Sequence, residues 1–232
     1  MNRCVEPEWL DELSPADPRA AGSRRDLQRL NAWMGSAASV ARALRVVPAR
    51  PGLRLADLGT GDGMFLLQVA RRLGRGWRGT KATLLDRQDT VAPEVRAGLA
   101  ELGWHMETVQ MDVMEWLRQP VIEPYEVLVA NLFLHHFSKP QLAQLLAQAS
   151  KRTRTFIAAE PRRSPLAFIA SRLIWFIGCN GVTRHDAPAS VRAGFAGREL
   201  SALWPPDGNW NLREGPNGWA GHLFAARNKP GP

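Results

Sequence analysis

The sequence predicts an α/β fold in which short strands and helices alternate around a mostly parallel sheet. Residues 53–73 begin with apolar side chains at every second position, pass three glycines and end with apolar side chains at helical spacing. This change of period predicts a strand, a tight turn and a helix. Strand-like and helix-like segments then alternate as far as residue 160, which is typical of βαβ units with right-handed connections.

The composition is that of a folded domain. The 232 residues are 45% apolar, enough for one sizeable α/β domain with additions. No apolar run has the length of a membrane span, and the charged first residues lack the apolar stretch of a signal peptide. Cys4 and Cys179 make neither a disulfide framework nor a C-x-x-C pair, so a reduced, cytoplasmic setting is expected.

The net charge of +8 permits nucleic acid or an acidic membrane surface as a partner. The basic residues are scattered, however, and no block of five or six of them occurs. This distribution favours a solvated basic surface over a dedicated binding tail.

The expected elements follow from periodicity, capping residues and the positions of proline and glycine. Ser23 is a good N-cap for a helix that ends at Gly35, whereas residues 1–21, rich in proline and acidic residues, predict an arm with at most one helical turn. Residues 1–48 are expected to form the arm and two helices, before a domain of residues 49–232. The expected strands are 53–58, 81–86, 106–110, 125–130, 155–160, 210–214 and 221–227, and the expected helices are 23–35, 36–47, 65–73, 93–103, one starting near 114, 140–152 and 190–204, with a helical lid insertion over about 162–190.

The glycine turn carries the first functional signal. Gly59, Gly61 and Gly63 let the backbone take positive φ and let another molecule approach closely, and the helix that follows offers free N–H groups. The spacing is G-x-G-x-G, which differs from a dinucleotide fingerprint and lacks the Lys-Ser/Thr ending of a P-loop. Because Asp57 stands beside the loop, a ligand with positive charge is favoured over a polyphosphate.

The segment D-L-G-T-G-D-G, from Asp57 to Gly63, resembles the first motif of class I S-adenosylmethionine-dependent methyltransferases. That family has a Rossmann-like, seven-stranded, mostly parallel sheet with flanking helices and a helical lid, and its glycine loop cradles the amino-acid end of the cofactor. The resemblance implies S-adenosyl-L-methionine as cofactor. It also implies that the helices of residues 1–48 cover the site, although plain packing on the sheet stays open. The loop residues expected to contact the cofactor are Asp57, Gly59, Thr60, Gly61 and Gly63.

Polar residues also follow the second and third predicted strands. Asp86 ends the second strand, where a carboxylate can accept hydrogen bonds from both ribose hydroxyls, and Arg87 flanks the adenine side in such a layout. In the resembled family the third strand leads to an adenine contact, which matches Asp112 and the backbone N–H of Val113. Asp112 is equally suited to cap the following helix, and both roles are compatible.

The fourth predicted strand runs into Asn131 and a Leu-rich turn that ends in His135-His136. This segment resembles small-molecule methyltransferases of the ubiquinone-biosynthesis type, in which the end of this strand faces the transferred methyl group. It is neither N-P-P-Y nor D-P-P-Y, which argues against amino methylation of adenine or glutamine by that motif. Ligands of such sheets bind at the carboxyl ends of the strands, so the glycine loop, Asp86, Asp112 and Asn131 are expected to meet one cofactor.

Residues 162–190 interrupt the alternation. Their very apolar first half predicts a helical insertion, which in the resembled family forms a substrate lid. Phe168, Trp175 and Phe176 are candidates for lining an aromatic or lipidic pocket, while a core helix and amphipathic docking on a membrane stay open. The two final strands suggest a hairpin, and the resemblance implies that the seventh strand lies antiparallel to the rest.

Methyl transfer to oxygen needs an aligned nucleophile and a base for its proton, and histidine is suited to that role near neutral pH. His185, followed by Asp186 at the end of the lid, is the predicted base, with His136 shaping the site or sharing the role. A hydrogen-bonded turn residue for His136 and a surface loop residue for His185 are the plain alternatives. No metal site is predicted, because adjacent histidines are poor geometry for a single ion and no His-x-x-x-His occurs.

These resemblances imply S-adenosylmethionine-dependent O-methylation of a small phenolic or polyketide-derived molecule. The arrangement as a whole resembles bacterial methyltransferases found beside type III polyketide synthases, on the segments SRRDLQRLNAWMG, EPRRSPLAF and SVRAGF. The alternatives are an RNA or protein methyltransferase on the same fold and a non-catalytic cofactor-binding partner protein. An aromatic or polyketide-like small molecule is the expected partner, nucleic acid is not favoured, and peripheral membrane contact is open.

Overall fold

A seven-stranded sheet in the order β3-β2-β1-β4-β5-β7-β6 forms the middle layer of the computed structural model, which describes residues 1–14, 16–120 and 122–229. The first five strands are parallel, β7 is antiparallel to β5, and β6 is antiparallel to β7. This confirms the predicted Rossmann-like fold, in which the seventh strand lies antiparallel to the rest. The strands are β1 (Arg54–Leu58), β2 (Lys81–Asp86), β3 (His105–Gln110), β4 (Tyr125–Asn131), β5 (Thr153–Pro161), β6 (Trp210–Asn217) and β7 (Gly221–Asn228).

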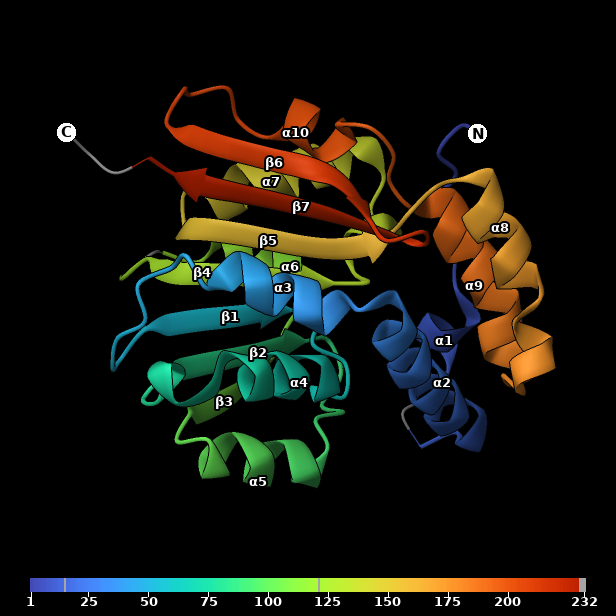
Figure 1. Cartoon of the computed structure of the whole chain (residues 1–232), viewed down its shortest axis with the longest axis horizontal. Coiled ribbons are helices and arrows are strands. Elements are labelled where there is room, and N and C mark those ends of the chain that lie inside the picture. The colour runs from blue at the N-terminus through green and yellow to red at the C-terminus, as the bar shows by residue number, and fades with distance from the viewer. Residues whose placement is uncertain (15, 121, 230–232) are drawn as a thin grey trace.

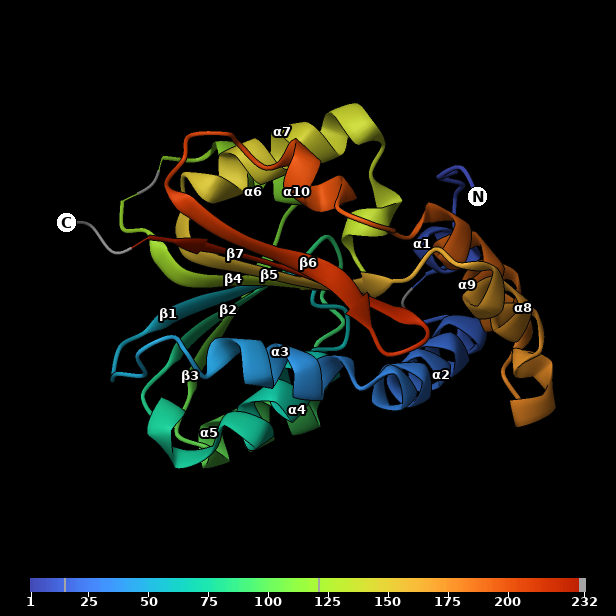
Figure 2. The same ribbon diagram turned by 45° about the horizontal axis from the view of Figure 1, so that its top comes forward.

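Helices cover both faces of the sheet, as Figures 1 and 2 show. One face carries α3 (Ser36–Leu44), α4 (Met64–Leu73), η1 (Gly74–Trp77) and α5 (Pro93–Glu101), and the other carries α6 (Val113–Arg118), α7 (Lys139–Ser150) and α10 (Glu199–Leu203). None of the helices in the described part of the chain is long and apolar enough to cross a membrane.

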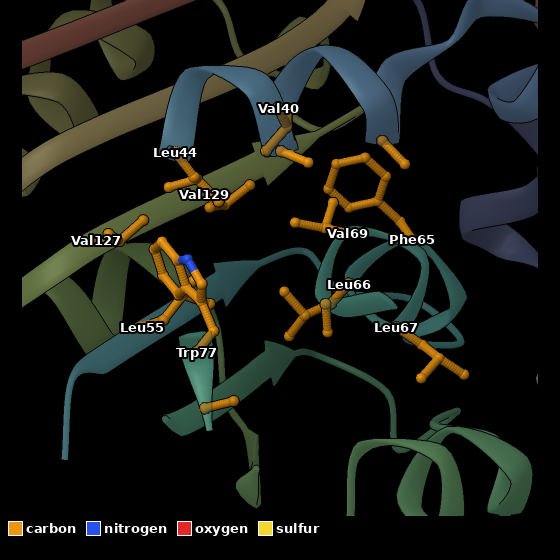
Figure 3. Packing of buried hydrophobic residues seen from close by; sticks show 14 of the residues in the cluster. Val40, Leu44, Leu55, Phe65, Leu66, Leu67, Val69, Trp77, Val127 and Val129 are labelled. Atoms are coloured by element: carbon orange, nitrogen blue, oxygen red, sulfur yellow. The ribbon is translucent and has the colours of Figure 1, made fainter. Parts of the chain in front are cut away.

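Two apolar clusters hold these layers together, one on each face of the sheet. Figure 3 shows the first, in which Val40 and Leu44 of α3 and Leu66 and Val69 of α4 gather with residues of β1 and β4. Strand β4 contributes to both clusters, because it lies in the middle of the sheet and is buried on both faces. That burial explains why its sequence is an apolar run rather than an alternation.

The remaining helices lie together at the carboxyl ends of the parallel strands (Figure 1). They are α1 (Trp9–Glu12), α2 (Pro18–Met34), α8 (Pro165–Arg172), η3 (Ile174–Ile177) and α9 (Gly181–Ala193), while the short turn η2 (Leu134–His136) follows β4. The N-terminal arm therefore comes to the same end of the sheet as the insertion after β5.

The predicted start of the first long helix is wrong. Helix α2 begins at Pro18 because the Asp17 carboxylate caps it by accepting from the N–H of Arg19, and proline suits the first helical position. Ser23 lies inside the helix instead, buried, with its hydroxyl accepting from Thr183 Oγ1 at 3.0 Å.

The insertion after β5 is helical, as predicted for residues 162–190, and it is divided into separate helices. The chain makes α8 and η3, turns at Gly178 in the left-handed region, and then starts α9, capped by Asn180. Residues 181–186 belong to this second helix, so the plain alternative of a surface loop at His185 is wrong. The single helical region predicted over 190–204 is broken at Gly194, where any Cβ would come within 2.3 Å of the Pro161 carbonyl oxygen.

Candidate active site

A cavity of about 710 Å³ opens at the carboxyl ends of the parallel strands, within the range of small-molecule sites. Its floor comes from the loops after β1, β2, β3 and β4, and its walls come from α2, α8 and α9. One end of the cavity meets the glycine loop, and the other meets a group of histidine and carboxylate side chains.

The glycine loop needs glycine for two reasons. Gly59, Gly61 and Gly63 have φ values of 67°, 55° and 77°, in the left-handed region that favours glycine. At Gly59 the Phe133 ring also lies so close that an added Cβ would come within 2.1 Å of it. The backbone of the loop is thereby open to the cavity, which Gly59, Thr60 and Gly61 line.

Asp57 lies beneath this loop. Its side chain is buried and accepts a hydrogen bond from Thr60 Oγ1 at 2.8 Å, and it does not line the cavity. Burial raises the pKa of Asp57 to about 7, with the charges of Asp86 and Asp62 adding to the rise and the Thr60 bond opposing it. The structure therefore places Asp57 as a support of the loop, and Gly63 likewise lies behind it as the cap of α4.

The Asp86 carboxylate ties the loop to the end of β2. Its two oxygens accept from the backbone N–H groups of Gly61 at 2.9 Å and Gln88 at 3.0 Å, and it lines the cavity together with Arg87. Asp112 Oδ1 caps α6 by accepting from Met114 and Glu115 N–H.

The capping prediction for Asp112 is confirmed. Its other oxygen, Oδ2, makes no hydrogen bond within the described residues. Asp112 and Val113 both line the cavity, so this oxygen is left for a ligand.

Asn131, at the end of β4, presents an unsatisfied acceptor. Its Nδ2 donates to Asn31 Oδ1 at 3.3 Å, whereas its own Oδ1 is buried without a partner among the described residues. A buried acceptor without a donor is costly, so a ligand that donates a hydrogen bond, such as an ammonium group, fits this wall of the cavity. The next residue, Leu132, has a φ of 50°, a strained conformation of a kind that clusters at functional sites.

The far end of the cavity is built around His135. Its Nδ1 lies 2.8 Å from Glu160 Oε2 and its Nε2 lies 3.3 Å from Glu8 Oε1. The other Glu160 oxygen accepts from the N–H groups of Phe133 and Leu134. Burial alone would lower the pKa of His135, but hydrogen bonds to Glu160 and Glu8 and their charges outweigh it and raise this pKa to about 9. The ring is therefore a buried cation held between two carboxylates.

His136 is the more exposed of the two histidines that line the cavity. Its Nδ1 lies 3.2 Å from Asp11 Oδ2 of the N-terminal arm. Burial would raise the pKa of Asp11, but the hydrogen bond and charge of His136 lower it. Asp11 is thus placed to orient the ring.

His185, the predicted base at the end of the lid, does not line this cavity. It is on the outer side of α9, stacked on Trp9 at 3.8 Å, with Nδ1 2.9 Å from Asp186 Oδ1. Asp186 in turn accepts from the N–H groups of Trp9 and Leu10. The His185-Asp186 pair therefore holds the arm against α9.

His135 and His136 lie closer together than was expected of adjacent histidines. The adjacent rings of His135 and His136 lie on the same side, with centroids 4.2 Å apart, because η2 turns tightly. One ligand atom from each of Glu8, His135 and His136 lies within 4.8 Å of the others, so this group could hold a cation. The same side chains also contact Glu160, Asp11 and the Ser190 hydroxyl.

Three carboxylates at the histidine end of the cavity were not predicted from the sequence. Glu160 carried a usable signal, because it ends the fifth predicted strand at the same edge as Asn131. Glu8 and Asp11 carried none, because the arm is placed by contacts with α9 that local sequence does not reveal.

Comparison with known proteins relates the chain to methyltransferases. Residues 55–155 match the model of a family described as a methyltransferase domain, less than half of the chain. The sequence has no match among curated proteins.

Solved structures share the fold. An O-methyltransferase family protein from Burkholderia thailandensis has a TM-score of 0.64 at 17% identity, over 94% of this chain and 62% of that one. The pyocyanin biosynthetic protein PhzM has a TM-score of 0.61 at 17% identity, over 95% of this chain and 60% of that one. Magnesium protoporphyrin IX methyltransferase (ChlM) from Synechocystis PCC 6803, with bound SAH, has a TM-score of 0.55 at 13% identity, over 84% of this chain and 83% of that one. The chain thus spans about three fifths of the length of the first two.

The family match and the fold confirm the resemblance to class I methyltransferases. Residues 55–155 therefore match a methyltransferase domain, the fold is shared with a structure that holds SAH, and S-adenosylmethionine is the expected cofactor. The open glycine loop and the unpartnered Asn131 Oδ1 fit that molecule, which brings an ammonium and a sulfonium.

The buried His135 cation makes a prediction about stability and pH. The pKa of His135 is about 9 in the folded protein and near 6.5 when unfolded, so the stability it contributes is complete below about pH 6.5 and is lost as pH rises to about 9. We expect the free energy of unfolding, measured by denaturant titration, to fall across this window. His135→Gln should flatten the fall, whereas His105→Gln, on the exposed edge of β3, should leave it unchanged. An identical pH profile for His135→Gln and the unsubstituted protein would contradict the ion-pair assignment.

Proposed function

We propose that the protein transfers a methyl group from S-adenosylmethionine to an oxygen of a small aromatic molecule, phenolic or polyketide-derived. The observation that carries this proposal is the single cavity that runs from the glycine loop to His136. The similar structures include an O-methyltransferase family protein and a pyocyanin biosynthetic protein, which supports a small-molecule acceptor.

The residues at the loop end would hold the cofactor. Backbone of Gly59 and Gly61 would face its amino-acid end, and Asn131 Oδ1 would accept from its ammonium group. The Asp86 carboxylate would accept from the ribose hydroxyls, and Asp112 Oδ2 from the adenine amine. When bound, the cofactor supplies an electrophilic methyl group on a sulfonium.

At the other end, His136 would act as the general base. It would take the proton of the acceptor hydroxyl, and Asp11 would hold the ring in position and stabilise the charge it gains. The His135 cation, fixed by Glu160 and Glu8, would favour the negative oxygen that forms beside it. Phe133 and Phe137, packed edge to face at 5.1 Å, offer an aromatic wall for the acceptor. This assignment replaces His185, which the fold keeps on the outer side of α9.

A larger acceptor such as RNA or a protein remains the alternative on this fold. The walls from α2, α8 and α9 and the arm enclose the acceptor end, which favours a molecule small enough to enter the cavity. A non-catalytic cofactor-binding protein is the other alternative, and the His136-Asp11 pair is the feature that argues for turnover.

The cofactor position predicts the effect of Asp86→Ala. Removing a carboxylate that accepts hydrogen bonds should weaken S-adenosylmethionine binding by about tenfold to a hundredfold. Isothermal titration measures this, with an unchanged melting temperature as evidence of folding. Asp89→Ala is the matched control, because Asp89 lies on the surface in an ion pair with Arg96. Equal affinities for the two variants would overturn the assignment of the ribose.

The base assignment predicts that His136→Asn lowers turnover by about a hundredfold to ten-thousandfold while cofactor affinity is unchanged. Transfer of labelled methyl groups to a panel of phenols measures this. His185→Asn should stay within roughly tenfold of the unsubstituted enzyme, since it affects only the anchoring of the arm. A large loss in His185→Asn with little change in His136→Asn would restore the sequence-based choice of base.

Direct proton transfer to His136 also predicts the effect of metals. Turnover should be unchanged after treatment with EDTA, and added Zn²⁺ should inhibit by binding Glu8, His135 and His136. If EDTA abolishes turnover and one divalent ion restores it, the group acts as a metal site, and the acceptor oxygen is activated by the ion instead.

A further inference from the structure

The insertion after β5 exposes an unusual number of large apolar side chains. Six of them, all on α8 and η3 or between them, have between 39% and 67% of their surface exposed, and we call them the lid patch. They are Leu166, Ile169, Leu173, Trp175, Phe176 and Ile177. An apolar surface of this kind, concentrated in 12 consecutive residues, marks an interaction site.

The lid patch is separate from the cavity. Helix α8 turns a different face inward, and this face lines the cavity with Ala167, Ala170 and Ser171. Leu166, Ile169 and Leu173 follow one another at three- and four-residue spacing on the outer face. The exposure is therefore not needed to form the active site.

A cationic pocket of about 410 Å³ adjoins the patch. Arg172 and Arg184 line it together with His185, and no carboxylate does so among the described residues. Neither guanidinium forms an ion pair in the described part of the chain. The walls are the rings of Trp9 and Trp175, the first stacked on His185 and the second on Phe176 at 3.7 Å.

We propose that the lid patch docks on a membrane that contains anionic phospholipid. The six apolar side chains enter the boundary between headgroups and acyl chains, and lipid phosphates bind Arg172 and Arg184. Tryptophan is suited to that boundary, because its ring is apolar and its N–H is polar. The net charge of +8 adds attraction to an anionic surface.

Charge complementarity favours an anionic membrane over a second copy of the chain as the partner of the lid patch. Two copies that met through this face would bring two pairs of unpaired arginines together, which is unfavourable. A membrane supplies phosphates to the pocket and hydrocarbon to the patch at the same time. Since α8 walls the cavity on its inner face, docking would also set the active site beside the lipid, where an apolar acceptor concentrates.

Co-sedimentation of the full chain with vesicles tests the proposal. We expect binding to vesicles of phosphatidylcholine mixed with phosphatidylglycerol, weaker binding to phosphatidylcholine alone, and a decrease with salt. Arg172→Gln with Arg184→Gln should weaken binding to the mixed vesicles by roughly thirtyfold, and Trp175→Ser with Phe176→Ser by at least about tenfold. None of these substitutions touches the cavity residues proposed for methyl transfer.

Matched controls keep the test specific. Arg75→Gln removes an exposed arginine on η1, and Val46→Ser removes an exposed apolar side chain at the end of α3, and both should bind vesicles as the unsubstituted protein does. Equal vesicle binding by all four variants, or no binding at all, would overturn the proposal. So would a dimer, seen by light scattering, that Trp175→Ser with Phe176→Ser dissociates. Cofactor affinity is measured in parallel, and its retention separates a failure of docking from a failure of the proposed methyl transfer.

Discussion

The buried carboxylate of Glu160 is the interaction on which the acceptor end of the site depends. It accepts from two backbone N–H groups of the turn after β4 and pairs with His135, which reaches Glu8 of the N-terminal arm. A buried carboxylate must be fully paired to be tolerated, so each partner fixes the others. Glu160 lies at the end of β5, a strand inside the sheet. Its contacts therefore fix η2 and the N-terminal arm, which have little regular structure of their own, to the sheet.

The cofactor end depends on a different constraint, the close approach of backbone and side chains around Gly59. The Phe133 ring occupies the place where any other residue would carry its Cβ, which joins the loop after β1 to the turn after β4. The strained Leu132 lies directly before that ring. Loop and turn are thus shaped together, and the site can be expected to hold its geometry before a ligand arrives.

The fold and the position of the glycine-loop end of the cavity could be predicted from sequence, because both depend on local patterns. The change of period at Gly59 and the polar residues at strand ends, such as Asp86, place the site without any knowledge of packing. The acceptor end could not be predicted in the same way. Glu8 reaches it because Asp186 accepts from N–H groups at the start of α1, a contact across 177 residues. His185 is turned outward by the helical phase of α9, which the pattern of residues 162–190 does not fix.

The N-terminal arm and the loops of the sheet line different ends of the cavity, so one end can be changed without the other. The first helix and its flanks bring Glu8, Leu10 and Asp11 into the cavity, whereas the loops after β1 and β2 line its other end. The arm is attached through Asp186 and through Arg3, which donates to carbonyl oxygens of η2 and α9. A library that varies only the arm residues that line the cavity, and keeps these anchors, would reshape one end of the cavity and leave the loops after β1 and β2 untouched.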